Sequence, residues 1–175
     1  VLPLIRLLET APTGKIEEDL LLSAARGDSW SNWDSQSANA LANLRAQAAL
    51  ALAQIGDDRA VPVLSAYLGQ IATIIEVDSA SERADKSMIR VYSIVCRALA
   101  ALGSKEGIDA MVSSLDGIAA KVPHMIVYNL RICTGQTFGP ESSQPEHLWP
   151  GIIAQWRAWW RENREGVWSW YGSPA

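Results

Sequence analysis

The side chains that most often carry catalysis or hold metals are few and widely separated in this sequence. His124 and His147 are its two histidines. His124 follows a proline at the expected start of a helix, where a place in the first turn or contact with solvent accounts for it. His147 lies near Glu141 and Glu146 in a proline-containing segment, and these side chains offer at most a weak metal site. No nucleophile stands beside a base, so we expect no catalytic residue, no metal and no cofactor.

The two cysteines are expected to be structural. Cys96 and Cys133 each lie inside a helical pattern, and neither belongs to a Cys-x-x-Cys pair. Thiols in such positions are usually buried and behave as small hydrophobic side chains. A disulfide between them would require their two helices to meet at these positions. We therefore expect two buried thiols without redox chemistry.

The acidic and glycine-containing segments do not form a ligand site either. The run Glu17–Asp19 falls in the first turn of an expected helix, where carboxylates favour the positive end of the helix dipole. Residues 76–86 mix acidic and basic side chains without the regular oxygen spacing of a calcium loop. The glycines of residues 135–151 are scattered and do not precede a helix as a phosphate loop requires.

Eight tryptophans are the most unusual feature of the sequence, and they gather near its two ends. Ile153, Trp156 and Trp160 share one helical face, so we expect them in the core, with Trp159 at its boundary. The aromatic residues of the C-terminal tail either dock over this last helix or form a surface for a partner or a sugar. We treat Trp30, Trp33, Trp168, Trp170 and Tyr171 as a secondary candidate binding surface, next to the one described at the end of this section.

Composition favours an all-α fold in a single domain over residues 1–175. Hydrophobic residues make up 49% of the chain, Ala and Leu dominate them, and there is a single Phe. The net charge of −4 argues against nucleic acid as the main partner. No apolar run approaches the roughly 20 residues that a membrane span needs. Val1 is not an initiator methionine, so we expect residues to have been removed upstream, and export or a cytoplasmic location both stay open.

Apolar residues recur at helical spacing, and one pattern occurs twice. The spacing predicts a buried stripe on a helix at about 37–55, formed by Leu41, Leu44, Ala48, Leu52 and Ile55. The next helix carries Val61, Leu64, Leu68, Ile71 and Ile75, and the same spacing returns 47 residues later as Ile108, Met111, Leu115, Ile118 and Val122. The segment Ala51–Gly56 likewise returns as Ala98–Gly103. The sequence therefore contains an internal repeat of helical pairs.

The segment between these helices is similar to a known type of repeat. Residues 56–64, Gly-Asp-Asp-Arg-Ala-Val-Pro-Val-Leu, resemble the inter-repeat turn of bacterial HEAT-repeat proteins, and residues 103–108 are a weaker copy. Residues 130–139, followed by Trp156–Trp160, resemble the C-terminal end of many such proteins. The resemblance implies a short right-handed α-solenoid of stacked antiparallel helix pairs, with about eight helices and a Trp-rich C-terminal capping helix.

The expected repeat pairs are residues 15–55, 59–102 and 105–134, with a cap at 150–163 and an aromatic tail at 164–175. The chain departs from the family in two long breaks, at residues 27–36 and 76–86, where a tight turn is usual. The number of repeats therefore stays open.

This resemblance implies a non-catalytic module for protein interaction or scaffolding, with an unidentified protein as partner. Two alternatives remain. One is a HEAT-like enzyme or enzyme accessory, such as the phycobilin lyase relatives or the HEAT-like DNA glycosylases, although no catalytic residue of either can be matched here. The other is a carbohydrate-binding surface formed by exposed tryptophans.

Helical geometry also predicts where a partner would bind. With Val95 and Leu99 pointing inward, Arg90 and Arg97 turn to the opposite side of their helix. The 47-residue repeat places Leu50 at the position of Arg97, and aligning Leu130 with Leu99 brings Tyr128 next to Arg97. The candidate partner-binding residues are therefore Leu50, Arg90, Arg97 and Tyr128. Ordinary solvated or inter-helix positions remain the alternative.

Overall fold

The computed structural model describes residues 2–9, 35–80, 86–117, 119–120, 122–140 and 145–165. These residues form helices and connecting turns, and no strand occurs among them, which confirms the all-α class for this part of the chain. The α-helices are α1 (Leu2–Glu9), α3 (Ser35–Ile55), α4 (Val61–Ala80), α5 (Lys86–Ala101), α6 (Lys105–Ser114), α7 (Pro123–Thr134) and α8 (Trp149–Asn163). Two short 3-10 helices, η2 (Asp58–Ala60) and η3 (Glu146–Leu148), precede α4 and α8. The helix expected at residues 15–26 lies outside the described residues.

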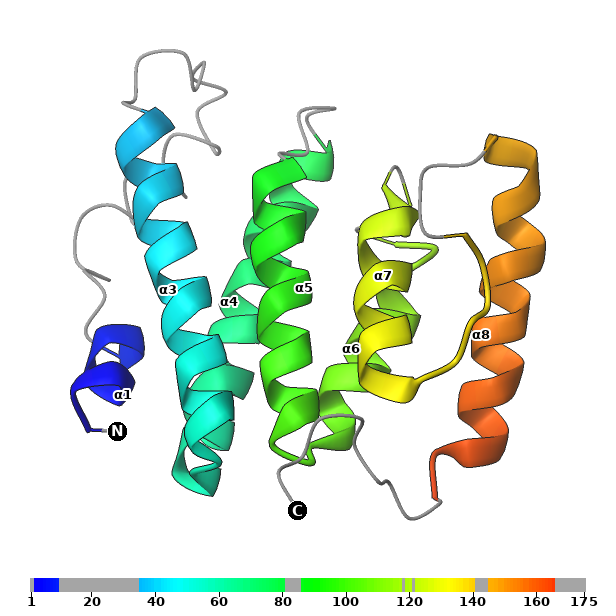
Figure 1. The fold of residues 1–175 in the computed structure, drawn as a ribbon. Helices are drawn as coiled ribbons and strands as arrows, with labels where there is room; N and C mark the ends of the chain where they lie inside the picture. Colours follow the sequence, from blue (N-terminus) through cyan, green and yellow to red (C-terminus); the bar gives the residue numbers. More distant parts are fainter. Residues whose placement is uncertain are drawn as a thin grey trace.

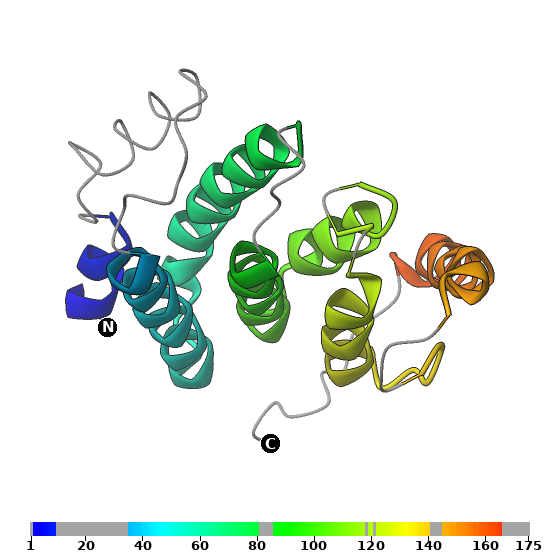
Figure 2. The ribbon, with the colours of Figure 1, turned by 90° about the horizontal axis from the view of Figure 1, so that it is seen from above.

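The helices lie in two layers. Helices α3, α5 and α7 stand side by side in one layer, and α4 and α6 lie behind them (Figures 1 and 2). The central helix α5 contacts α3, α4, α6 and α7. Helix α1 packs on α3 and α4 at one end, and α8 packs on α6 at the other. None of the helices in the described ranges is long and apolar enough to cross a membrane.

The turns after α3 and α5 each contain a glycine with a positive φ angle, and these glycines are 47 residues apart. Gly56 and Gly103 adopt φ angles of 71° and 79°, the left-handed conformation that ends helices and that glycine adopts without a steric penalty. The carboxylate of Asp57 then accepts a hydrogen bond from the Arg59 backbone amide at 3.0 Å, which caps η2. The repeat read from the sequence is thus a repeat of helix ends as well as of apolar positions.

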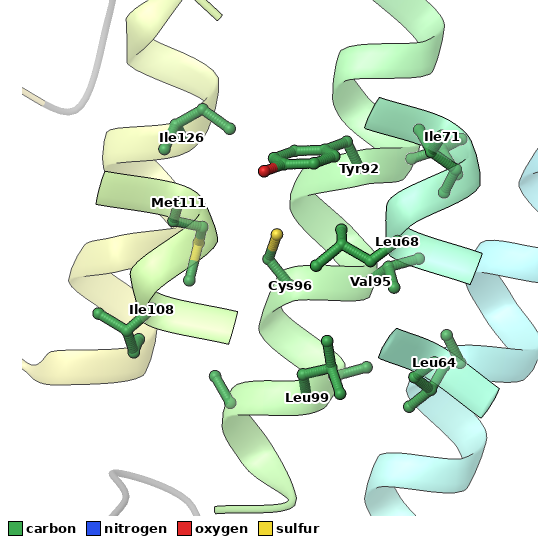
Figure 3. Packing of buried hydrophobic residues seen from close by; sticks show 14 of the residues in the cluster. Leu64, Leu68, Ile71, Tyr92, Val95, Cys96, Leu99, Ile108, Met111 and Ile126 are labelled. Carbon is green, nitrogen blue, oxygen red and sulfur yellow. The ribbon is translucent and has the colours of Figure 1, made fainter. Parts of the chain in front are cut away.

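The core lies between the two layers, on both sides of α5. Figure 3 shows Val95 and Leu99 of α5 beside Leu64, Leu68 and Ile71 of α4. Tyr92 and Cys96 turn toward α6 and α7. Four of the five expected apolar positions of α4 are confirmed as buried, namely Leu64, Leu68, Ile71 and Ile75, and Val61 is half-buried.

Two expectations about the helices are wrong. In α3, Leu44 and Ile55 are 52% and 51% exposed, whereas Ala46 and Ala49 are fully buried. Ala48 and Leu52 of the expected stripe are buried, so the predicted stripe is right at these two positions and wrong at Leu44 and Ile55. The helix expected to continue to Val122 ends at Ser114, although Leu115 and Val122 are buried as expected.

Helices α5 and α6 approach each other closely at Gly107. A Cβ atom added there would lie 2.2 Å from the Cys96 carbonyl oxygen and 2.7 Å from the Ala100 backbone nitrogen. Real Cβ atoms do not come this close to backbone atoms, so the crossing requires glycine. This close contact fixes how α5 and α6 cross.

Candidate functional site

Between Arg90 and Ala101, the outward side of α5 is a narrow stripe of four residues. Arg90 and Ala101 are exposed, and Ile94 and Arg97 are half-buried. Steps of four, three and four residues place them on one helical face. Residues between these positions are buried, so from Arg90 to Ala101 this stripe is the part of the helix that a partner could reach.

Corresponding positions on α3 and α7 continue the stripe to both sides. The 47-residue repeat relates Gln47, Leu50 and Gln54 of α3 to the α5 stripe, and of these Leu50 is half-buried and the two glutamines are exposed. On α7, Tyr128 is 53% exposed, between half-buried Met125 and Ile132. We call the resulting surface the α3–α5–α7 face: Gln47, Leu50, Gln54, Arg90, Ile94, Arg97, Ala101, Met125, Tyr128 and Ile132.

The four predicted partner-binding residues thus occur on three helices that are neighbours in one layer. Leu50 lies on α3, Arg90 and Arg97 on α5, and Tyr128 on α7, and α5 contacts both other helices (Figure 1). None of them is fully buried. The sequence did not single out Ile94, Met125 and Ile132, which share the face with them. Their half-burial depends on neighbouring helices, and helical spacing alone could not reveal it.

Polar contacts beneath this face hold α5 and α7 together. Asn129 of α7 is buried, and its amide donates hydrogen bonds to the Ser93 hydroxyl of α5 at 3.2 Å and to the Met125 carbonyl at 3.0 Å. Arg131 donates to the Gly139 carbonyl at 2.8 Å, which ties α7 to the segment that leads to α8. Buried hydrogen-bonded groups restrict relative movement of the helices that carry them. Arg97 and Tyr128 therefore stand on a fixed support.

The two cysteines are free and buried, as predicted. Burial raises the pKa of the Cys133 thiol to about 12, and the nearby Arg97 charge opposes part of that rise. Burial also raises the pKa of Cys96 well above its usual value, and Cys133 adds to this effect. Both thiols are protonated at neutral pH, so neither is a ready nucleophile.

The remaining predicted chemical groups do not come together in the described part of the chain. His124 is half-buried in the first turn of α7, as expected, and His147 is exposed in η3. No group of three potential metal-binding side chains occurs within the described ranges. Glu141 and all five aromatic residues of the second candidate surface, Trp30, Trp33, Trp168, Trp170 and Tyr171, lie outside those ranges.

The tryptophans of α8 close one end of the molecule. Trp156 is fully buried and Trp160 nearly so, while Trp159 is half-buried, as the helical spacing predicts. Ile153 is half-buried against the core. The Phe138 ring lies 5.2 Å from the Trp156 ring in an edge-to-face arrangement. These residues of α8 are structural.

Asp109 of α6 anchors α8 and was not predicted from the sequence. Its two carboxylate oxygens accept hydrogen bonds from the Trp160 indole at 2.7 Å and from Arg164 at 2.8 Å. Arg157 pairs with Asp116, and Lys105 pairs with Glu165 at 3.1 Å. Three acid–base pairs therefore join α8 to the α6 region, and they use charges that lie away from the α3–α5–α7 face.

The comparison with protein families identifies one repeat in the chain. Residues 44–70 match the PBS lyase HEAT-like repeat, a stretch that covers the second half of α3, the turn at Gly56 and the first half of α4. No curated protein and no solved structure matched the chain. The matched segment is centred on the turn whose sequence resembles the HEAT-repeat motif, and it includes Leu50 of the α3–α5–α7 face.

Proposed function

We propose that this chain, which is a HEAT-like repeat protein by its match over residues 44–70, is a non-catalytic module that binds a protein partner on its α3–α5–α7 face. In this proposal the helix pairs are stacked as a short right-handed α-solenoid that α8 caps. Stacked helical repeats often use one extended layer of helices to bind partners.

The observation that carries the proposal is the composition of the α3–α5–α7 face. Arg90 and Tyr128 are exposed, and Leu50, Ile94 and Arg97 are half-buried beside them. Tyr and Arg are enriched among the residues that contribute most to binding between proteins. A surface that combines them with partly covered aliphatic side chains offers both apolar area and specific hydrogen bonding.

The alternative of a HEAT-like enzyme or enzyme accessory has less support. The described thiols are buried and protonated at neutral pH. Within the described ranges no metal-binding cluster supplies a reacting group instead. The proposal therefore assigns no catalytic role to the described helices.

Site-specific photo-crosslinking tests the proposal. Tyr128 is replaced with p-benzoylphenylalanine, and the purified chain is irradiated in a lysate of the source organism. The matched control carries the same group in place of Ala158, which is exposed on α8 away from the face. We expect a discrete crosslinked adduct from position 128, reduced by an excess of unlabelled wild-type chain.

Competition with variants shows whether the face itself is responsible. An excess of the Leu50→Asp variant should compete poorly, because it carries a charge into the apolar part of the face. Equal amounts of adduct from positions 158 and 128 would contradict a binding role for this face. So would a Leu50→Asp competitor that reduces the adduct from position 128 as strongly as the wild-type competitor does.

A further inference from the structure

The charges of the α3–α5–α7 face indicate the chemistry of its partner. Building on the binding role proposed above, we infer that the face takes an acidic protein segment. Carboxylates of that segment pair with Arg90 and Arg97, and its apolar side chains lie against Leu50, Ile94 and Tyr128.

The first observation is that acidic residues are absent from one layer of the molecule. Helices α3, α5 and α7 contain no Asp and no Glu, although the whole chain has 19 acidic against 15 basic residues. Their charged residues are Arg45, Lys86, Arg90, Arg97 and Arg131. Acidic residues do occur on each of α4, α6 and α8. An acidic protein thus presents one layer of helices whose charges are all positive.

The second observation is that the two arginines of the face have no acidic partner among the residues that the structure describes. Elsewhere in the described part of the chain, Arg157 and Arg164 pair with Asp116 and Asp109. No ion pair among the described residues involves Arg90 or Arg97. Arg97 is half-buried, so part of its hydration is already lost without a compensating carboxylate. A partner carboxylate would supply that compensation.

The spacing of the arginines sets the spacing of the carboxylates that would bind them. Arg90 and Arg97 are seven residues apart on one helical face, which is about 10 Å along the axis at 1.5 Å per residue. Acidic residues three positions apart in an extended segment, or seven apart in a helix, span a similar distance. Ile94 lies between the two arginines, so the matching segment has an apolar residue between its carboxylates.

The same features favour a protein segment over a nucleic acid. Proteins that follow a phosphate backbone neutralise many successive charges with Lys and Arg. Here Arg90 and Arg97 alternate with Ile94 and Ala101, and Leu50, Met125 and Ile132 flank them. Apolar positions between the cations fit a segment that alternates acidic and apolar side chains. The net charge of −4 also repels a long polyanion more than a short acidic segment.

Selection from a random 16-residue peptide library displayed on phage tests this inference with the purified full chain. We expect the selected peptides to be enriched in Asp and Glu interspersed with apolar residues. Binding of a synthetic labelled peptide from this set should weaken about tenfold in Arg90→Glu and in Arg97→Glu, because each reversal replaces an attraction with a repulsion. Arg161→Glu, the same reversal on exposed α8, should leave the affinity unchanged.

A charge-swapped peptide, in which the acidic residues are replaced with Lys, separates pairing from general damage. It should bind the Arg90→Glu/Arg97→Glu double variant better than it binds the wild type. Peptides without acidic enrichment, bound through Tyr128 and Leu50 but insensitive to both arginines, would overturn the inference and leave the binding role intact. Selected peptides whose binding does not change in any variant of the face would overturn both the inference and the proposed binding role. Tighter binding of a single-stranded 16-nucleotide DNA than of the selected peptides would also overturn the inference.

Discussion

Arg97 and Tyr128 are placed so that their removal should affect binding far more than folding. Tyr128 is 53% exposed, and Arg97 has no ion pair with another described residue. Substitutions at such surface positions usually change the free energy of unfolding by less than about 0.5 kcal/mol. We expect Arg97→Glu and Tyr128→Ala to have denaturant midpoints close to that of the wild type. Leu130→Ala, at a fully buried position on the same helix as Tyr128, should lose about 2 to 5 kcal/mol.

Trp156 should be among the costliest residues to truncate. It is fully buried and its ring contacts Phe138 and Trp159, so Trp156→Ala should lower the free energy of unfolding by about 3 to 5 kcal/mol. Arg161→Ala, on the exposed side of the same helix, should change it by less than about 0.5 kcal/mol. Urea titration followed by tryptophan fluorescence measures both. Equal stability of the two variants would show that α8 is not part of the core.

The buried thiols should make the protein less stable in alkali. Burial raises the pKa of Cys133 from 9.0 to about 12 in the folded protein, and raises that of Cys96 as well. Between about pH 9 and 12 the unfolded chain therefore loses these protons while the folded chain keeps them, and stability falls as pH rises. The decrease should be smaller in Cys96→Ala/Cys133→Ala, measured by urea titration at pH 9, 10 and 11. An equal decrease in the free energy of unfolding with pH in the two proteins would contradict the effect assigned to burial of the thiols.

At the scale of the helix, the crossing of α5 and α6 gives the sharpest contrast between two glycines. Gly107→Ala places a methyl group against the backbone of Cys96 and Ala100, and should lower stability by about 1 to 3 kcal/mol. Gly69→Ala adds the same methyl group to α4 with no atom within 4 Å, and should raise stability by about 0.5 to 1 kcal/mol. Thermal unfolding followed by circular dichroism separates these outcomes, and a stabilised Gly107→Ala would refute the close contact.

The buried residues of a helix could be predicted where large apolar side chains recur at helical spacing. This holds for α4, whose Leu64, Leu68 and Ile71 are buried as expected, and for α5 with Val95 and Leu99. It fails in α3, where small residues are buried and two of the large residues are exposed. Ala46 and Ala49 of α3 are fully buried, and a pattern based on residue size favours Leu44 and Ile55 instead.

Helix ends were predicted where glycine marks them, and the end of α8 at Asn163 also matches the expected cap at 150–163. Gly56 and Gly103 end α3 and α5 as expected. The end of α6 at Ser114 was missed because the apolar spacing continues through Leu115 to Val122, and both of these residues are buried without being in α6. An apolar period thus predicts burial better than it predicts where a helix stops.

At the scale of the whole molecule, the candidate face was predicted in part. Transferring positions through the 47-residue repeat placed Leu50, Arg97 and Tyr128 on three neighbouring helices. The net charge of −4 pointed away from a positively charged surface, because a sum over the chain hides how charge divides between layers. Counting charges helix by helix would have shown that α3, α5 and α7 contain no acidic residue.

Nuclear magnetic resonance of the 19.0 kDa chain tests the central claim most directly. Amide resonances are recorded while an acidic peptide from the library selection is added. A partner on the α3–α5–α7 face should shift amides near Leu50, Arg90, Arg97 and Tyr128 and leave those on the outer side of α8 in place. Shifts gathered on α4, α6 or α8, with these four positions unchanged, would contradict the claim that this face binds the partner.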